Sequence, residues 1–219
     1  MVKVHPHYLS QLKRLFDLVL AILLSIFISP IILMISLIVL ITAGFPIIFK
    51  QKRTGQNGKT FTIFKFRTMK KNASLIKHKY LKMNEAPKPM FKIHNDPRFV
   101  GFGQFLSKSG FDELPQLLNI IKGEMSFVGP RPLPVKEALA LPKSWKYFRE
   151  KVRPGVFSEW TLAEERHSSL KKWRMLEEKT LKKNNKNQLI LILKMVIHFF
   201  TKLLKLDSLK DRQSFRSKK

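Results

Sequence analysis

Two adjacent carboxylates, Asp112 and Glu113, are the residues whose types and spacing best suit chemistry on a phosphate. They stand at the predicted start of a helix, and a rigid turn, GPRP at 129–132, follows with Arg131. A helix N-terminus keeps carboxylates ionised and offers free backbone N–H groups to a phosphate. An ionised Asp112 could therefore act as a nucleophile, with Glu113 as a ligand for a metal ion.

The same pair also has a purely structural interpretation. Asp112 is a good helix N-cap, and a glutamate in the first turn favours the helix dipole. Apolar residues then recur at helical spacing up to Gly123, a residue type that commonly follows a helix end. They are Leu114, Leu117, Leu118 and Ile121. Spacing alone favours this capping interpretation, so the rest of the chain has to support the catalytic one.

The composition points to a polyanionic partner. The chain has 219 residues, with 42 Lys and Arg against 15 Asp and Glu and a net charge of +27. Such a balance suits nucleic acid, an anionic membrane surface or phosphorylated substrates. The chain has no cysteine, which excludes disulfides and thiolate metal sites. Its length allows one ordinary domain with an additional segment.

That additional segment is apolar. Asp17 is the single charged residue between positions 15 and 49, and no small-residue cleavage site follows, so a removable signal peptide is not expected. Proline deletes a backbone donor and clashes with the preceding turn, which predicts a break at Ser29-Pro30. Each half then reaches only about 22 Å, against a hydrocarbon core of about 30 Å.

Two paths through the membrane remain open from the residues alone. Basic residues flank both ends of the segment, which suits a re-entrant helix hairpin that enters and leaves on the cytoplasmic side. A straight span with a proline kink is equally compatible with the sequence. In the hairpin, the Ser29 hydroxyl would satisfy a backbone carbonyl freed by the break.

The remaining elements would position the carboxylates. Residues 59–69 alternate β-forming side chains and predict a strand with Phe61, Ile63, Lys65 and Arg67 on one face. The two cations could grip a phosphate, although taken alone a half-exposed amphipathic strand is the favoured interpretation. Helices are predicted within 70–93, 99–108, 137–153 and 162–183.

The last part of the chain is expected at the membrane surface. Residues 188–206 carry long apolar runs interrupted by lysines, which predicts an interfacial amphipathic helix followed by a basic tail suited to anionic lipid. The predicted fold is thus α+β and mostly helical, with a small strand element. We divide it into a membrane hairpin (1–49), a cytoplasmic catalytic domain (50–187) and an interfacial helix with its tail (188–219).

Several spaced motifs together resemble the bacterial sugar transferases, specifically the small, monotopic polyprenyl-phosphate phosphoglycosyl transferases. The resemblance covers about two thirds of the chain, from Lys13 to Gly155, with the motifs in the family's order. They are KRLFDLVLA (13–21), Ser29-Pro30, FKQKRTGQNGKTF (49–61), KFRTM (65–69), DPR (96–98), FDELPQLLNIIKGEMSFVGPRP (111–132) and RPG (153–155).

The resemblance implies an activity. Such enzymes transfer a sugar phosphate from a UDP-sugar to undecaprenyl phosphate at the cytoplasmic face of the bacterial inner membrane. This is the first membrane step of surface glycan synthesis (exopolysaccharide, O-antigen or glycoprotein glycan). The products are an undecaprenyl-diphosphate sugar and UMP. A homodimer or later glycosyltransferases are further expected partners.

The resemblance also implies roles for individual residues. Asp112 would be the covalent nucleophile, and with Glu113 it would hold Mg2+. The cations Lys65, Arg67, Arg98 and Arg131 would bind the diphosphate. Ser29-Pro30 matches the break of the family's re-entrant helix, which favours the hairpin over the kinked span.

The chain departs from the family pattern at several positions. An arginine usual five residues before the nucleophile is replaced by Ser107, and a Ser-Leu pair by Gly110-Phe111. Lys92 or Lys108 could supply the missing charge. The stretch after Gly155 (VFSEWTLAEERH) also differs, and Asn187-Gln188 stands where an acidic residue is usual.

These departures raise a second hypothesis, a catalytically silent member that scaffolds a glycan-assembly complex. A third, a membrane-tethered nucleic-acid binder, rests on net charge alone and lacks a recognisable motif. We expect a divergent but active enzyme that does not bind nucleic acid.

Overall fold

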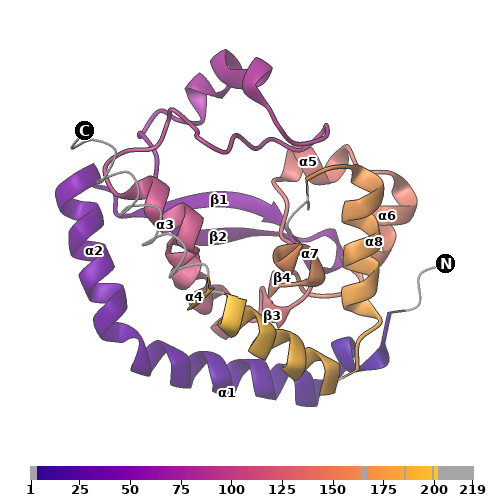
Figure 1. Ribbon diagram of the computed structural model, residues 1–219. Coiled ribbons are helices and arrows are strands. Elements are labelled where there is room, and N and C mark those ends of the chain that lie inside the picture. The colour runs from indigo at the N-terminus through magenta and orange to yellow at the C-terminus, as the bar shows by residue number, and fades with distance from the viewer. Residues whose placement is uncertain (1–3, 164–166, 185, 199, 202–219) are drawn as a thin grey trace.

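The computed structural model describes residues 4–163, 167–184, 186–198 and 200–201. It is mostly helical and contains two small two-stranded sheets within the described residues, which confirms the predicted α+β class (Figure 1). A short 3-10 helix, η1 (Pro6–Leu9), precedes the apolar segment. Its Tyr8 hydroxyl donates to the Thr180 carbonyl at 2.7 Å, which joins the start of the described chain to a helix far along the sequence.

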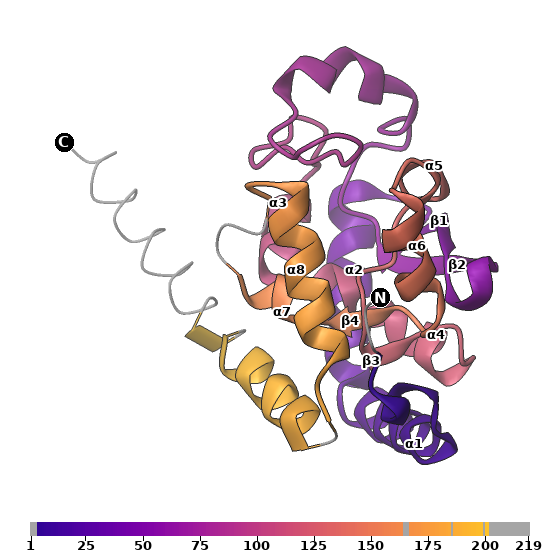
Figure 2. The same ribbon diagram turned by 90° about the vertical axis from the view of Figure 1, so that its right-hand side faces the viewer.

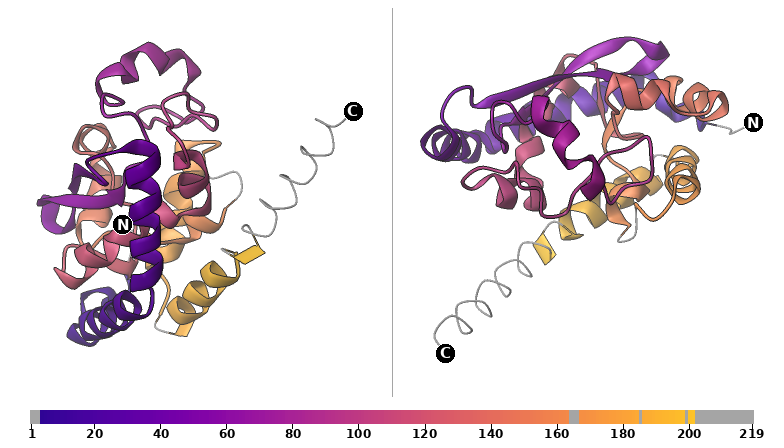
Figure 3. Two further views of the ribbon diagram at one scale, coloured as in Figure 1. Left: turned by 90° about the vertical axis from the view of Figure 1, so that its left-hand side faces the viewer. Right: turned by 90° about the horizontal axis from the view of Figure 1, so that it is seen from above.

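The apolar segment folds as two helices, α1 (Gln11–Phe27) and α2 (Ser29–Ala43), bent by 64° (Figure 3). The predicted break at Ser29-Pro30 is confirmed. The Ser29 hydroxyl donates to the Ile26 carbonyl at 2.8 Å, which is the carbonyl that Pro30 has no N–H to serve. Among the described residues no single helix is long and apolar enough to cross a membrane, whereas this pair passes that test together.

The antiparallel hairpin β1–β2 lies along one side of the molecule (Figures 2 and 3). β1 (Ile48–Thr54) pairs with β2 (Thr60–Phe66) from Ile48↔Phe66 to Thr54↔Thr60. A single 3-10 turn, η2 (Gln56–Gly58), connects them, with Asn57 and Gly58 at positive φ. Phe61 and Ile63 are buried on one face, as the alternation predicts, and the strand stops three residues before its predicted end.

Residues 70–98 leave the body of the molecule and stand at the end opposite α1 (Figures 1 and 2). The helix predicted in this stretch is present as the 3-10 helix η3 (Leu75–Met83). The chain returns through α3 (Gly103–Ser109), which packs against the next element, η4 (Phe111–Gln116).

The prediction that Asp112 caps a helix is wrong. Asp112 lies inside η4, and the cap position is taken by Gly110, whose φ of 90° is in the left-handed region that glycine adopts freely. Pro115 cannot donate a helical hydrogen bond and restricts the residue before it, and the α-helix α4 (Leu117–Ile121) begins only after it. Gly123, with φ of 81°, follows the helix as predicted.

A second, parallel sheet joins β3 (Ser126–Val128) to β4 (Gly155–Phe157). Here the two backbones almost touch, because a Cβ placed on Gly155 would lie 2.0 Å from the Gly129 nitrogen. In the sequence, α5 (Val135–Leu139) and α6 (Lys143–Glu150) connect these two strands. The single helix predicted over 137–153 is therefore wrong. Pro142 forces the residue before it out of the helical region and divides the stretch.

Helices α7 (Glu159–Leu162) and α8 (Leu170–Leu181) follow β4 and pack together. α8 lies within the charged helix predicted over 162–183. Residues 186–198 and 200–201 are also helical and lie at the same end of the molecule as α1 (Figures 1 and 2). Leu191 in this helix belongs to the main apolar cluster, together with Ala21 of α1 and Trp145 of α6. The predicted basic tail lies outside the described residues.

Candidate active site

The structure brings Glu113 together with two of the predicted phosphate-binding cations. Lys65 Nζ lies 2.6 Å from Glu113 Oε1 and 3.7 Å from Asp112 Oδ2. Arg131 Nη2 lies 3.2 Å from the same Glu113 oxygen. Residues from three separate segments of the sequence thus form one cluster of two acids and two bases, supplied by β2, η4 and the turn after β3.

The two carboxylates titrate in opposite directions. Burial, together with the neighbouring Glu113 charge, raises the pKa of Asp112 above its ordinary value, against the opposing effect of Lys65. Burial would also raise the pKa of Glu113, but the charges and hydrogen bonds of Lys65 and Arg131 outweigh it and hold that pKa far below its usual range. Glu113 is therefore the firmly ionised member, and Asp112 carries the less stabilised charge.

A buried asparagine holds the carboxylates against the strand that carries Lys65. Asn119 of α4 is fully buried, and its side chain forms hydrogen bonds with one backbone carbonyl and one backbone N–H of β2. Its Nδ2 donates to the Thr62 carbonyl at 2.7 Å, and its Oδ1 accepts from the Phe64 N–H at 3.1 Å. The distance between η4 and Lys65 is thereby set by hydrogen bonds rather than by apolar packing alone.

The apolar helix α1 contacts the C-terminal end of α4. Arg14 Nη1 donates to the Ile120 carbonyl at 2.6 Å and Nη2 to the Ile121 carbonyl at 2.8 Å. These carbonyls belong to the last turn of α4, where a cation also complements the helix dipole.

A second contact from α1 reaches the strand before Arg131. The buried pair Lys13 and Asp17 contacts β3, since Lys13 Nζ donates to Ser126 Oγ at 2.7 Å and the Phe127 N–H donates to Asp17 at 3.4 Å. The apolar segment is thus attached to α4, which follows the element that carries the carboxylates, and to β3, which precedes the turn with Arg131.

The structure does not bring Arg67 and Arg98 to the carboxylates. Arg67 is buried and donates to the backbone carbonyls of Ala43 and Gly44, at the end of α2. Arg98 is also buried and pairs with Asp96. Each guanidinium therefore stabilises the fold where it lies, and nothing in the geometry supports the predicted phosphate contacts.

Two further cations act on the carboxylate pair. Arg53 was not predicted from the sequence, and Lys92 was one of two candidates for the charge lost at Ser107. Burial lowers the pKa of Arg53, and the Arg131 charge lowers it further, whereas Glu137 and Glu113 raise it. Arg53 therefore belongs to the same electrostatic neighbourhood, although its position in a basic strand gave no sign of this. Among the candidates for the charge lost at Ser107, Lys92 acts on the pKa of Asp112, whereas Lys108 Nζ donates to Asn95 at 3.1 Å.

The donor set fits Mg2+ bound together with a substrate. Within the described residues no group of three or more His, Cys, Asp or Glu side chains is suited to hold a metal ion. Mg2+ commonly uses only one or two carboxylates and completes its shell with water and substrate phosphate. The adjacent carboxylates Asp112 and Glu113 can supply such a partial shell, with one Glu113 oxygen already engaged by Lys65 and Arg131.

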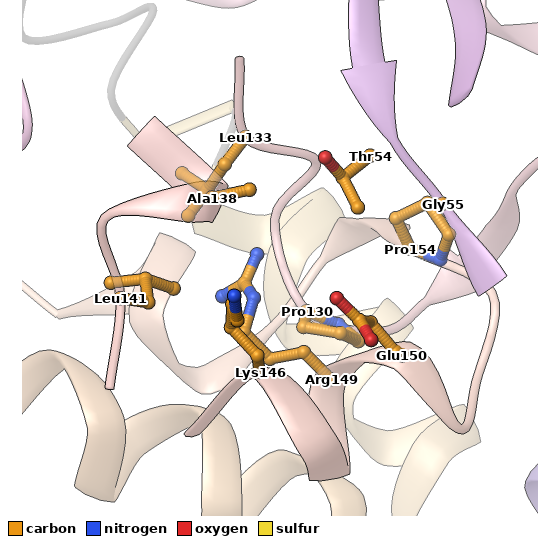
Figure 4. A pocket seen from close by; sticks show the side chains of 10 residues that line it. All are labelled: Thr54, Gly55, Pro130, Leu133, Ala138, Leu141, Lys146, Arg149, Glu150 and Pro154. Carbon is orange, nitrogen blue, oxygen red and sulfur yellow. The ribbon is translucent and has the colours of Figure 1, made fainter. Parts of the chain in front are cut away.

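A small pocket lies on the α6 side of the turn that carries Arg131 (Figure 4). Its polar lining residues are Thr54, Lys146, Arg149 and Glu150, and Pro130 contributes the turn itself. None of the four clustered residues lines it, so it is separate from the carboxylate pair.

Most of this chain matches a known protein family. The family model described as bacterial sugar transferase matches residues 8–205. An exopolysaccharide production protein, ExoY of Sinorhizobium fredii, is 41% identical over 155 residues, which are 69% of this chain and 68% of that protein.

Longer relatives match over a similar stretch. The undecaprenyl-phosphate galactose phosphotransferase of Salmonella typhimurium is 38% identical over 157 residues, 69% of this chain and 32% of that protein. The UDP-glucose:undecaprenyl-phosphate glucose-1-phosphate transferase of Escherichia coli is 38% identical over 152 residues, 66% of this chain and 29% of that protein. The chain therefore belongs to the bacterial sugar transferase family and is an enzyme of the sugar-phosphate transferase class.

Proposed function

We propose that this enzyme transfers a sugar phosphate from a UDP-sugar to undecaprenyl phosphate, giving an undecaprenyl-diphosphate sugar and UMP. The observation that carries the proposal is the position of Asp112 and Glu113 beside Lys65 and Arg131. The relatives named as undecaprenyl-phosphate sugar transferases support the same substrates.

In the first proposed step the Asp112 carboxylate attacks the β-phosphorus of the donor. A bond forms between the carboxylate oxygen and phosphorus, and the bond from phosphorus to the bridging oxygen breaks. UMP leaves with that electron pair, and the sugar phosphate stays on Asp112 as an acyl phosphate. Lys65 and Arg131 can balance the negative charge of the diphosphate, since both already lie against the carboxylates.

In the second step a phosphate oxygen of the lipid attacks the same phosphorus and releases the Asp112 carboxylate. While Lys65 and Arg131 face it, the lowered pKa of Glu113 makes it a weak base. We assign it the proton of a singly protonated acceptor phosphate only once the substrate phosphates have drawn these two cations away. Mg2+ held by Asp112 and Glu113 would neutralise the diphosphate oxygens when bound.

The membrane arrangement is part of the proposal. Large apolar side chains are exposed along α1 and α2, among them Leu15, Val19, Ile26, Phe27, Leu33, Met34, Leu37 and Ile41. The helix over 186–198 and 200–201 also exposes Leu189, Leu193, Ile197 and Phe200. We assign α1–α2 to a re-entrant hairpin and this helix to the interface at the cytoplasmic face, where anionic lipid would meet the basic surface.

The test is turnover by the purified chain in a bilayer. Protein in nanodiscs is incubated with Mg2+, undecaprenyl phosphate and a panel of UDP-sugars, and UMP release is measured. We expect UMP with at least one sugar and none from Asp112→Asn. If no sugar supports UMP release, or if Asp112→Asn keeps full activity, the proposal is wrong. Turnover would also exclude the catalytically silent scaffold.

A further inference from the structure

A fully buried glutamate lies outside the cluster of site residues. Glu177 of α8 has no exposed surface. Its oxygens accept the indole N–H of Trp145 at 2.9 Å and of Trp173 at 3.0 Å, and both also bond Nη1 of Arg149. Every partner is a donor, so the carboxylate is held in one orientation. A charge at this depth is costly unless it is fully paired, and this one is.

The guanidinium on Glu177 also reaches the turn of the active site. Arg149 Nη2 donates to the backbone carbonyl of Arg131, while its Nη1 bonds Glu177. The side chain of Arg131 then contacts Glu113. A continuous chain of contacts therefore runs from α8 through α6 to the carboxylate pair. The planar guanidinium of Arg149 links its two halves, because one nitrogen bonds Glu177 and the other bonds the Arg131 carbonyl.

A second, independent contact supports the Arg131 side chain itself. Its guanidinium carbon lies 5.2 Å from the centre of the Trp160 ring. Trp160 stacks on Trp173, with ring centres 4.5 Å apart, and Trp173 is bonded to Glu177. Both tryptophans are buried, which leaves their faces to the protein rather than to a nucleotide base.

We propose that Glu177 and Trp160 are positioning residues that hold Arg131 for the donor diphosphate. Glu177 fixes the Arg131 backbone through Arg149, and the Trp160 ring packs against the Arg131 guanidinium. The support comes from α7 and α8, in or beyond the stretch after Gly155 where the chain departs from the family pattern. The inference rests on the proposed function, because it takes the diphosphate as the ligand of Arg131.

The test compares neighbouring glutamates on one helix. Glu178 pairs with Arg174 at 2.7 Å near the surface, so Glu178→Gln makes the same chemical change as Glu177→Gln without touching the path to Arg131. The full chain in nanodiscs is titrated calorimetrically with UDP and Mg2+, and UMP release and melting temperature are recorded beside it. We expect Glu177→Gln to raise the Kd for UDP about tenfold, as for a weakened bond from a charged donor. Glu178→Gln should leave it within about twofold.

Combination with Arg131→Met separates positioning from general destabilisation. If Glu177 acts through Arg131, Glu177→Gln has no further effect on UDP binding once Arg131 is replaced. Equal losses in both backgrounds, or an unchanged Kd in a folded Glu177→Gln protein, would overturn the inference. Should Glu177→Gln fail to fold, Arg149→Lys decides by the same cycle, since it keeps the charge facing Glu177 but loses the fork.

The binding measurement keeps the two proposals distinct. UDP binding that depends on Arg131 and responds to Glu177, without UMP release from any sugar, would support the inference and refute the proposed function. UMP release without coupling between the two residues would refute the inference alone.

Discussion

Replacing Arg14 tests whether the apolar helix α1 supports the active site in addition to the membrane role that we propose for it. Arg14→Met keeps an apolar stem but removes the hydrogen bonds to the carbonyls of Ile120 and Ile121. A bond from a charged donor contributes roughly 1.5–3 kcal/mol, and the guanidinium is partly exposed, so we take the lower limit. The loss is then about 3 kcal/mol for the two bonds.

That loss is smaller than the typical stability of a domain, so the protein should stay folded. For a chain of this size it corresponds to a melting temperature lower by about 6–12 °C. The carbonyls end the short helix that follows Asp112 and Glu113, and a small displacement of a nucleophile is costly. We therefore expect UMP release to fall by about tenfold or more, measured in nanodiscs at a temperature where the variant is folded.

Lys52→Met is the matched control. Lys52 also flanks the apolar segment, but it lies exposed on β1, so its replacement removes one basic charge without removing a contact to α4. If Arg14 served only to attract anionic lipid, both variants would lose activity equally and recover with more anionic vesicles. Equal losses, or full activity in Arg14→Met, would refute the reasoning.

Three further variants have defined outcomes. Asp112→Asn should abolish UMP release without lowering the melting temperature, because burial raises the pKa of this carboxyl and so makes its charge unfavourable to folding. Asp96→Asn should be less stable at neutral pH. Burial would raise the pKa of Asp96, but the hydrogen bonds from Arg98 outweigh it and lower it, so the difference from wild type in thermal melts should vanish as the pH falls through that lowered pKa. Gly155→Ala should lower melting temperature and turnover together, since its Cβ would meet the Gly129 backbone; a stable, active variant would contradict this.

Local patterns predicted those features that depend on a few neighbouring residues. The break at Ser29-Pro30 follows from the missing proline N–H, and the hydroxyl that compensates for it was predictable from the same dipeptide. The strand that carries Lys65 follows from the alternation of its own side chains. In each case the chemistry of one short segment decides the outcome.

Partners set by tertiary approach could not be predicted. Arg67 and Arg98 have the same side chain as Arg131, yet they bond the end of α2 and Asp96 because those groups lie within reach after folding. The capping interpretation of Asp112 failed for a related reason. Gly110 takes the cap position with a backbone that a non-glycine residue rarely adopts, which leaves the Asp112 carboxylate to face Lys65.

Three groups of contacts hold the site in place. α1 binds the end of α4 and the start of β3, Asn119 binds β2, and α6 with α8 holds the turn at Arg131. A short 3-10 helix such as η4 has little stability of its own, so its position is set by these attachments. We therefore expect changes in α8, after Gly155, to alter activity without a contact to Asp112. The comparison of Glu177→Gln with Glu178→Gln tests this, because Glu177 connects to Arg131 through Arg149 and Glu178 does not.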